Sequence, residues 1–354
     1  MTGMNLKPFL KLMVERNASD LFFSPMAPIK IKIEGRIMSV SKEPLSVEAV
    51  RDAALGLMTE AQRKTLEEDL EIDFAVSEPG LGRFRANVFH QRGNLAMVLR
   101  FITLDIPELD ALGLPSVLAG LAMEKRGLIL MVGATGSGKS TTLAAMVNYR
   151  NDRASDHILT IEDPIEFLHP NKKSIVNQRE LGLDTKSYSK ALRSAMREAP
   201  DVVLIGEIRD QETMEAAITL AGTGHLAIAT LHANNTAETL DRIINMFPQS
   251  QHAQIFMDLC HYLRAIIAQR LVMGRSNRRV AAVEVLLNTP HVAELIMKGE
   301  IGEIKEALRA SAEEGMQSFD EALFRLYKDG RISLDHALAY ADSSTDLEAR
   351  INFG

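Results

Sequence analysis

The chain of 354 residues carries a formal net charge of −7, is 46% hydrophobic and 25% charged, and contains one cysteine. This length suggests about two domains of roughly 150 residues each, and the composition is that of ordinary soluble globular proteins. The acidic balance disfavours a protein that binds nucleic acid through bulk charge. Because Cys260 is alone, an intramolecular disulfide is excluded, which favours a reducing compartment.

Membrane and export signals are weak in this sequence. No apolar run approaches the ~18 residues that a membrane span needs, and residues 1–11 lack the apolar core of a signal peptide. The sequence therefore predicts a cytoplasmic protein without a direct membrane span, which would associate with a membrane only through a partner.

The first 102 residues have the pattern of a small α+β domain. Residues 6–16 show helical periodicity, and residues 47–70 predict one or two helices with a break near Thr59. Strands are expected at residues 29–33, 74–76, 82–89 and 95–101. Residues 103–115 contain two prolines and little regular period, so we expect an interdomain linker there.

From about residue 116 the pattern changes to alternating strands and helices. Candidate strands lie at residues 128–132, 157–161, 174–178, 202–206 and 227–231. This alternation predicts an α/β core, residues 116–275, with a mostly parallel sheet covered by helices on both faces. The chain after about residue 250 is expected to be largely helical, with a strand at 280–287. Residues 276–354 would form a mainly helical region that ends, after about residue 340, in a polar and mobile tail.

A phosphate-binding loop carries the strongest functional signal. The segment 133–140 matches the pattern G-x-x-x-x-G-K-[ST], with an apolar strand before it and a helix after it. Glycines let backbone N–H groups wrap around phosphate oxygens at a helix N-terminus, Lys139 would reach the β- and γ-phosphates, and Ser140 would hold Mg²⁺. We expect ATP or ADP with Mg²⁺ to contact Gly133, Thr135, Gly136, Ser137, Gly138, Lys139, Ser140 and Thr141.

Two apolar strands of the predicted sheet run into carboxylates. The strand at 157–161 leads to Glu162, Asp163 and Glu166, any of which could polarise a water or help to hold the metal. The strand at 202–206 ends at Glu207, the best candidate for a carboxylate that supports Mg²⁺ (the Walker B role). The alternative for the neighbouring Arg209 and Asp210 is a local ion pair without a catalytic role.

Histidines and arginines complete the candidate set. His225 and His232 flank one predicted strand, where they could sense the γ-phosphate, and no nearby Cys or His completes the spacing of the competing zinc site. Arg83, Arg85 and Arg100 lie on predicted strands of the first domain. An arginine from another domain or subunit can neutralise charge in phosphoryl transfer, although exposed surface charge explains the pattern equally well.

These motifs in this order, together with Ala18-Ser19-Asp20-Leu21, resemble the secretion ATPase superfamily, and within it the type IV pilus retraction branch, the PilT/PilU family. The resemblance implies a homohexamer of subunits with a PAS-like N-terminal domain and a RecA-like ATPase domain. It assigns Glu166 as catalytic base, Glu207 as the Walker B carboxylate, and His225 and His232 as a His box. It also implies that Arg85 and Arg100 approach the γ-phosphate, with Arg83 a weaker match.

One segment departs from the retraction pattern. Residues 291–296, His-Val-Ala-Glu-Leu-Ile, lack the arginine and asparagine of the PilT motif Ala-Ile-Arg-Asn-Leu-Ile, which favours the PilU-like paralogue. The resemblance then implies an ATPase that hydrolyses ATP to ADP and phosphate and drives pilus retraction together with a PilT-like ring. It would act at the inner-membrane pilus base on a PilC-like platform protein. The alternatives are an assembly or secretion ATPase, a nucleotide-binding scaffold that modulates a partner ring, and a RecA-type nucleic-acid translocase.

Overall fold

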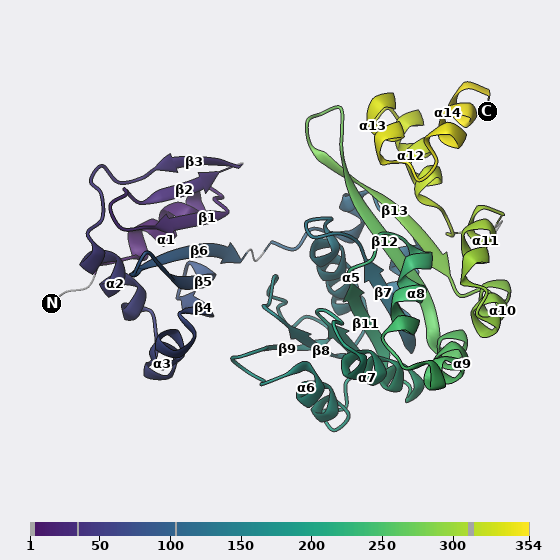
Figure 1. Cartoon of the computed structure of the whole chain (residues 1–354), viewed down its shortest axis with the longest axis horizontal. Coiled ribbons are helices and arrows are strands. Elements are labelled where there is room, and N and C mark those ends of the chain that lie inside the picture. Colours follow the sequence, from purple (N-terminus) through teal and green to yellow (C-terminus); the bar gives the residue numbers. More distant parts are fainter. Residues whose placement is uncertain (1–3, 34, 103–104, 311–314, 354) are drawn as a thin grey trace. The chain divides into compact units, whose positions relative to one another are not determined.

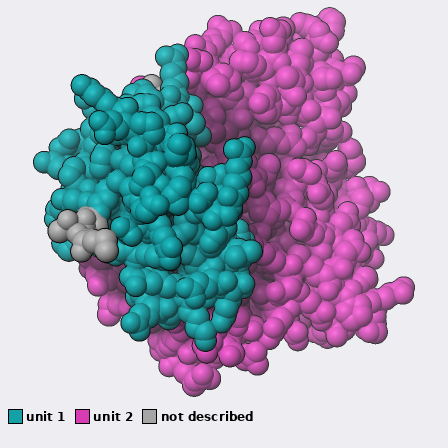
Figure 2. All heavy atoms as spheres, turned by 60° about the vertical axis from the view of Figure 1, so that its left-hand side comes forward, with its two compact units in different colours: residues 1–105, 166–168 teal, residues 106–165, 169–354 magenta. Residues whose placement is uncertain are grey.

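The computed structural model describes residues 4–33, 35–102, 105–310 and 315–353. Contacts divide the chain into two compact units, which Figure 2 shows in different colours. The first unit comprises residues 1–105 and 166–168, and the second comprises residues 106–165 and 169–354. The first two residues of the expected linker, 103 and 104, lie outside the described residues, and a short 3₁₀ helix, η1 (Leu109–Leu112), follows within the second unit.

The first unit is built on an antiparallel sheet with the strand order β3-β2-β1-β6-β5-β4 (Figure 1). The strands are β1 (Asp20–Phe23), β2 (Lys30–Ile33), β3 (Arg36–Ser39), β4 (Glu71–Glu78), β5 (Gly82–Gln91) and β6 (Asn94–Ile102), and the helices are α1 (Lys7–Glu15), α2 (Val47–Gly56) and α3 (Glu60–Asp69). The break expected near Thr59 is confirmed, because Thr59 and Gln62 form a capping box that starts α3.

One face of this sheet belongs to the hydrophobic core and the other carries polar side chains. Phe84 of β5 is fully buried, whereas its neighbours Arg83 and Arg85 lie together on the opposite face, as the period-two alternation predicts. Strand β3 was not expected from the sequence. All four of its residues are exposed, so its pattern shows no alternation between buried and exposed positions.

The second unit contains a seven-stranded sheet with the order β13-β12-β7-β11-β10-β8-β9. Its strands are β7 (Gly127–Val132), β8 (His157–Glu162), β9 (Ile175–Glu180), β10 (Val202–Ile205), β11 (Leu226–Leu231), β12 (Leu263–Met273) and β13 (Arg279–Leu287). Every neighbouring pair is parallel except β12 and β13. The expectation of an α/β fold with a mostly parallel sheet is confirmed.

Helices cover both faces of this sheet, since its buried residues divide between two apolar clusters. Residues 128, 130 and 132 of β7 belong to one cluster, and residues 129 and 131 belong to the other. The helices around the sheet are α4 (Val117–Ala122), α5 (Lys139–Arg153), α6 (Tyr188–Ala195), α7 (Gln211–Gly222), α8 (Thr236–Asn245) and α9 (His252–Tyr262), with the 3₁₀ helix η2 (Gln249–Gln251).

Two expectations about the C-terminal third are wrong. The region after residue 250 is not uniformly helical before residue 280, because β12 occupies Leu263–Met273 beside β7. The tail after residue 340 is not a loose polar segment. It forms α14 (Ser344–Phe353), whose Leu347 is 1% exposed. The other C-terminal helices are α10 (Pro290–Lys298), η3 (Ile301–Glu303), α11 (Ile304–Ala310), α12 (Phe319–Lys328) and α13 (Leu334–Tyr340). Among the described residues, no helix has the length and apolarity to cross a bilayer.

Candidate nucleotide-binding site

The glycine-rich loop connects the buried strand β7 to helix α5, in the order that the sequence predicts. Two of its glycines are required by close contacts. A Cβ at Gly133, where φ is +148°, would lie 2.5 Å from the carbonyl oxygen of Gln269, and one at Gly138, where φ is +89°, would lie 2.7 Å from the Gln269 side-chain nitrogen. Any larger residue would push the loop away from β12.

The loop presents donors to an anion. Gly138 is the N-cap of α5 and provides no side-chain cap, so the helix start offers its backbone N–H groups to a ligand. The hydroxyl of Ser137 is buried and has no hydrogen-bond partner among the described residues. The Lys139 ammonium donates to the carbonyls of Gly133 at 2.7 Å and Ala134 at 3.0 Å. Burial lowers the pKa of Lys139, and the charge of Glu207 opposes this effect.

The parallel register aligns the carboxyl ends of four neighbouring strands. Val132 of β7 pairs with Leu231 of β11, Ala229 of β11 pairs with Ile205 of β10, and Ile205 pairs with Ile161 of β8. The phosphate loop, His232 and Glu207 follow their strands, and Glu162 ends β8, at one edge of the sheet, where ligands of such folds bind.

Glu207 is the centre of a charged cluster at this edge. Its two carboxylate oxygens have different partners, because Arg209 contacts Oε2 at 2.8 Å and His232 Nε2 lies 3.0 Å from Oε1. Its side chain is 19% exposed, so the carboxylate is largely shielded yet reachable. Among the described residues, Arg209 pairs with Glu207 and forms no ion pair with Asp210. Asp210 instead caps helix α7 by accepting a hydrogen bond from the Thr213 amide at 2.8 Å.

The other acidic candidates have different surroundings. Glu162 accepts hydrogen bonds from Thr160 at 2.7 Å and Gln178 at 3.2 Å. Asp163 and Glu166 are exposed. Glu166 belongs to the first compact unit by its contacts, whereas Asp163 and the phosphate loop belong to the second.

The structure separates the two histidines. His232 follows β11 at the edge that carries the phosphate loop, but His225 precedes β11 at the opposite edge. With a rise of about 3.3 Å per residue, the strand holds them roughly 20 Å apart. The His225 ring contacts the Thr223 hydroxyl at 3.1 Å and the Leu220 carbonyl at 3.2 Å. Of the two histidines, His232 is the one that contacts Glu207.

In the first unit, the strand register places Arg85 and Arg100 side by side on the polar face of the sheet. Arg85 forms two hydrogen bonds of 3.1 Å with Asp73, and Arg100 donates to Asp20 at 2.9 Å. A cavity of about 280 Å³ lies between these pairs. Two arginines therefore converge on one hollow, each with a carboxylate partner.

Comparison with known proteins adds the decisive observation. Residues 4–325 match the model of a family described as type II/IV secretion system protein. The chain is 51% identical over 352 residues to the type IV pilus ATPase PilU of Pseudomonas aeruginosa, an alignment that covers 99% of this chain and 92% of that protein. The chain belongs to the PilT/PilU family of type IV pilus ATPases. The predicted family and the predicted ATPase class are confirmed.

Other relatives agree with this assignment to the PilT/PilU family. The retraction ATPase PilT of Pseudomonas aeruginosa is 41% identical over 334 residues, covering 94% of this chain and 97% of that protein. A crystal structure of the pilus retraction motor PilT with bound ADP superposes with a TM-score of 0.91 at 41% identity, covering 98% and 99% of the two chains. The Legionella pneumophila ATPase DotB gives a TM-score of 0.83 at 27% identity, covering 94% of each chain.

Sequence reasoning missed two residues of this PilT/PilU-family site. Gln269 of β12 donates to the Ser137 carbonyl at 2.8 Å and accepts from the Thr142 hydroxyl at 2.8 Å, so it fastens the phosphate loop. The Tyr188 hydroxyl lies so close to Gly206 that an added Cβ there would be 2.9 Å away. Burial and then the negative charge of Asp163 raise the pKa of Tyr188, so its phenol stays protonated. Neither residue belongs to a recognisable motif, and the residues that they contact lie far from them in the sequence.

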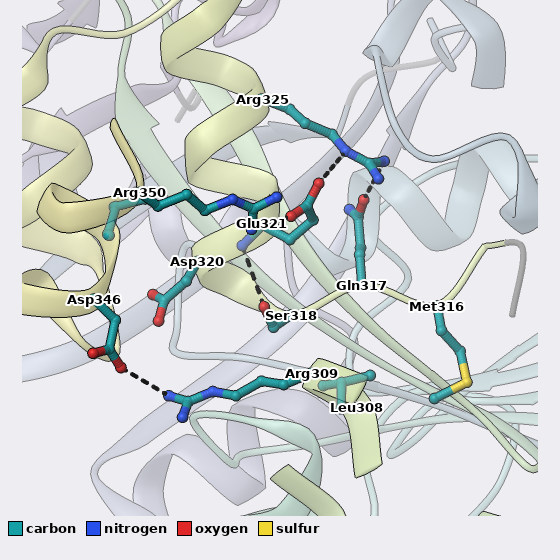
Figure 3. Close-up of a pocket in the computed structure, with 11 residues that line it drawn as sticks. Leu308, Arg309, Met316, Gln317, Ser318, Asp320, Glu321, Arg325, Asp346 and Arg350 are labelled. Carbon is teal, nitrogen blue, oxygen red and sulfur yellow. Dashed lines mark hydrogen bonds and ion pairs between the residues drawn. The ribbon is translucent and has the colours of Figure 1, made fainter. Parts of the chain in front are cut away.

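A separate pocket of about 400 Å³ lies among the C-terminal helices of this PilT/PilU-family chain (Figure 3). Its arginines are engaged by carboxylates. Arg325 and Arg350 both pair with Glu321, and Arg309 lies 3.9 Å from Asp346. These charges balance one another locally. The pocket contains none of the motif residues and lacks the features of an anion site.

Proposed function

We propose that this protein is a hexameric ATPase motor that powers type IV pilus retraction, acting as a PilU-like accessory to a PilT-like ring. The observation that carries the ATPase proposal is the alignment of Lys139, Glu207 and His232 at one edge of a parallel sheet. The similarity to PilU over 99% of the chain supports the accessory role.

The residues at this edge suit binding of ATP with Mg²⁺. The loop amides, the α5 N-terminus and Lys139 would bind the phosphates, and the exposed Ser140 hydroxyl together with Glu207 would support the metal. The metal would neutralise charge on the phosphates. Exposed Glu166 is the proposed general base, which would accept a proton from the attacking water as ADP and phosphate form. His232, in contact with Glu207, would register the state of the γ-phosphate, and we propose that His225 acts instead at a contact between subunits.

In a ring, the N-terminal unit of one subunit would supply arginines to the nucleotide site of a neighbour. We propose that Arg85 and Arg100 approach the γ-phosphate of a nucleotide held by a neighbouring subunit, so that hydrolysis depends on assembly. Their pairing with Asp73 and Asp20 fixes the guanidinium orientation on the sheet face.

Replacing Arg85 or Arg100 with alanine should lower ATP turnover of the assembled protein about tenfold or more while leaving nucleotide affinity near wild type. The effect should be smaller than that of a dedicated arginine finger, because each guanidinium already has a carboxylate partner. Phosphate release and fluorescent-nucleotide binding would measure both quantities. The Arg36→Ala variant removes an exposed arginine from β3 of the same sheet and serves as control. Full turnover in both site variants would mean that these arginines are only exposed charges on the sheet surface.

The accessory role is supported by the departure at residues 291–296. This segment lies in α10, where Val292, Leu295 and Ile296 are buried and Glu294 pairs with Lys298 at 2.7 Å. Ala293 and Glu294 thus stand where the PilT motif has its arginine and asparagine. We propose that the protein acts at the inner-membrane pilus base on a PilC-like platform protein.

The proposal is tested by following labelled pili in cells that carry this protein as the sole retraction-type ATPase, and in cells that also carry a catalytically inactive PilT ring. Retraction that requires the inactive ring is the expected result. Robust retraction without it would make this protein an autonomous motor. Absence of retraction in both settings would favour the scaffold or the assembly and secretion alternatives.

A further inference from the structure

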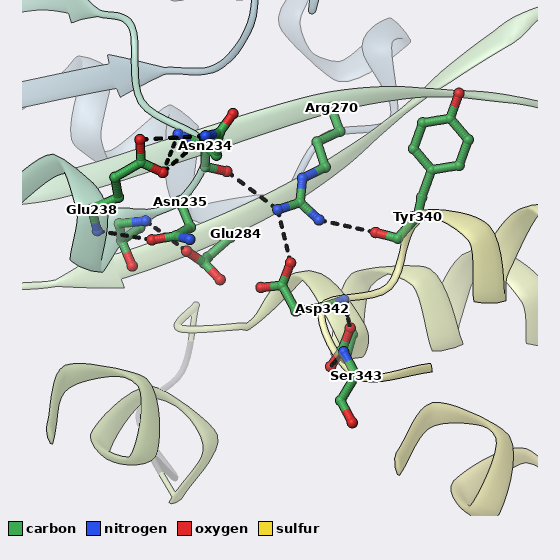
Figure 4. A network of polar contacts seen from close by, with 10 residues as sticks. Asn234, Asn235, Glu238, Arg270, Glu284, Tyr340, Asp342 and Ser343 are labelled. Atoms are coloured by element: carbon green, nitrogen blue, oxygen red, sulfur yellow. Dashed lines mark hydrogen bonds and ion pairs between the residues drawn. The ribbon is translucent and has the colours of Figure 1, made fainter. Parts of the chain in front are cut away.

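Arg270 of β12 lies at the centre of a polar network that belongs to no nucleotide motif (Figure 4). Its guanidinium donates to the carbonyl of Asn234 at 3.3 Å and to that of Tyr340 at 2.9 Å, and it pairs with Asp342 at 2.8 Å. The same group stacks 3.8 Å from the ring centre of Phe319. One side chain therefore joins the segment after β11 to the C-terminal segment 340–343.

The segment after β11 begins at His232 and is held by further contacts on its next residues. Asn235 caps α8 by accepting from the Glu238 amide at 2.8 Å. The Thr236 amide donates to the buried carboxylate of Glu284 at 2.8 Å. The contact from Arg270 to the Asn234 carbonyl lies nearest to His232 among these anchors in the sequence.

The C-terminal end of the network is equally ordered. The amides of Asp342 and Ser343 donate to the carboxylate of Asp320 at 2.8 Å and 3.2 Å. The side chains of Arg270 and Asp342 are 24% and 27% exposed, so their ion pair is largely shielded from water and firmer than a surface pair.

Strand β12 connects this network to the nucleotide site, because its neighbouring residues Gln269 and Arg270 contact the two regions. Side chains of successive strand residues point to opposite faces of a sheet. Gln269 contacts the phosphate loop on one face, and Arg270 contacts the segment after β11 from the other. Both residues follow Ala268, which pairs with Val132 at the end of β7.

We propose that Arg270 and Asp342 are positioning residues of the nucleotide site. The C-terminal segment 340–343 orients Arg270, Arg270 fixes the chain at Asn234, and this fixes the His232 ring against Glu207. The inference rests on the proposed function, because it requires the contact between His232 and Glu207 to act in ATP hydrolysis.

The Asp342→Asn variant of the full chain tests this inference, since it keeps the side-chain size and removes the charge that holds Arg270. We expect kcat for ATP to fall about three- to tenfold with KM within about twofold of wild type. Amide hydrogen exchange in peptides spanning 232–238 should accelerate, whereas exchange at 137–143 should not change. Arg270→Lys keeps the charge but not the planar fork, and should act in the same direction.

Arg350→Gln is the matched control, because it breaks an ion pair with Glu321 in the same helical region without reaching residues 232–238. Its kcat and exchange should equal those of wild type. Wild-type kcat and exchange in Asp342→Asn would overturn the inference, as would faster exchange throughout the second unit. Lys139→Ala is measured in parallel. If it hydrolyses ATP normally, the proposed site itself fails, whereas an inactive Lys139→Ala beside a fully active Asp342→Asn removes only the positioning role.

Discussion

Replacing Lys139 with alanine is expected to lower kcat/KM for ATP by about 100- to 1,000-fold. The Lys139 ammonium lies over the loop carbonyls of Gly133 and Ala134, where it can reach phosphates bound at the α5 N-terminus. Alanine removes this charge from a half-buried position that no other lysine occupies in the loop sequence. Phosphate release and direct nucleotide binding by fluorescence or calorimetry would measure the loss.

The matched control is Lys173→Ala, which removes an exposed lysine just before β9 in the same unit. Its activity should equal that of wild type. Unchanged ATP affinity in Lys139→Ala, with a folded protein confirmed by its thermal midpoint, would contradict the assignment of this loop to phosphate binding.

The Glu207→Gln substitution should lower turnover by about 100-fold or more while leaving nucleotide affinity within a few-fold of wild type. Glutamine keeps the size of the side chain but removes the charge that pairs with Arg209 and that would support the metal. The dependence of turnover on Mg²⁺ concentration should shift to higher concentrations. Steady-state kinetics across a magnesium titration would measure both effects.

Glu212→Gln is the control for this substitution, because it removes one carboxylate from an exposed ion pair with Arg193 in the same unit. Exposed ion pairs contribute little to the stability of the fold, so the turnover of this variant should match that of wild type. Near-normal hydrolysis by Glu207→Gln would mean that a different carboxylate, such as Glu162, supports the metal.

The elements that could be predicted from the sequence are those with a clear period or a recognisable boundary. The phosphate loop was identified because its strand, glycines and helix are contiguous, and Glu207 because a short apolar run ends on it. Helix α3 begins where the sequence breaks at Thr59, since the capping residues are local.

Strand β12 was missed because its hydrophobic pattern does not distinguish a strand from a helix. Its 11 residues, Leu-Arg-Ala-Ile-Ile-Ala-Gln-Arg-Leu-Val-Met, include a run of buried residues without alternation. Such a run fits a helix as well as a strand buried on both faces, and it follows α9 directly. Because β12 was not recognised, Gln269 and Arg270 could not be placed beside the loop or beside Asn234.

Other site features could not be predicted because they depend on contacts between distant segments. Arg209 and Asp210 are adjacent and oppositely charged, yet the first binds Glu207 and the second caps α7. His225 and His232 have the same residue type and lie close in sequence, but the strand between them sends them to opposite edges of the sheet.

The division of the central strands between two apolar clusters has a consequence for the tolerance of this protein to mutation. Along β7 and β10, successive side chains fill one cluster and then the other, so a shift of a single residue would exchange every partner. The relative positions of Lys139, Glu207 and His232 therefore depend on how the buried side chains of these strands pack. Val203 is fully buried and carries no reactive group, yet its packing helps to fix the positions of the charged residues at the site.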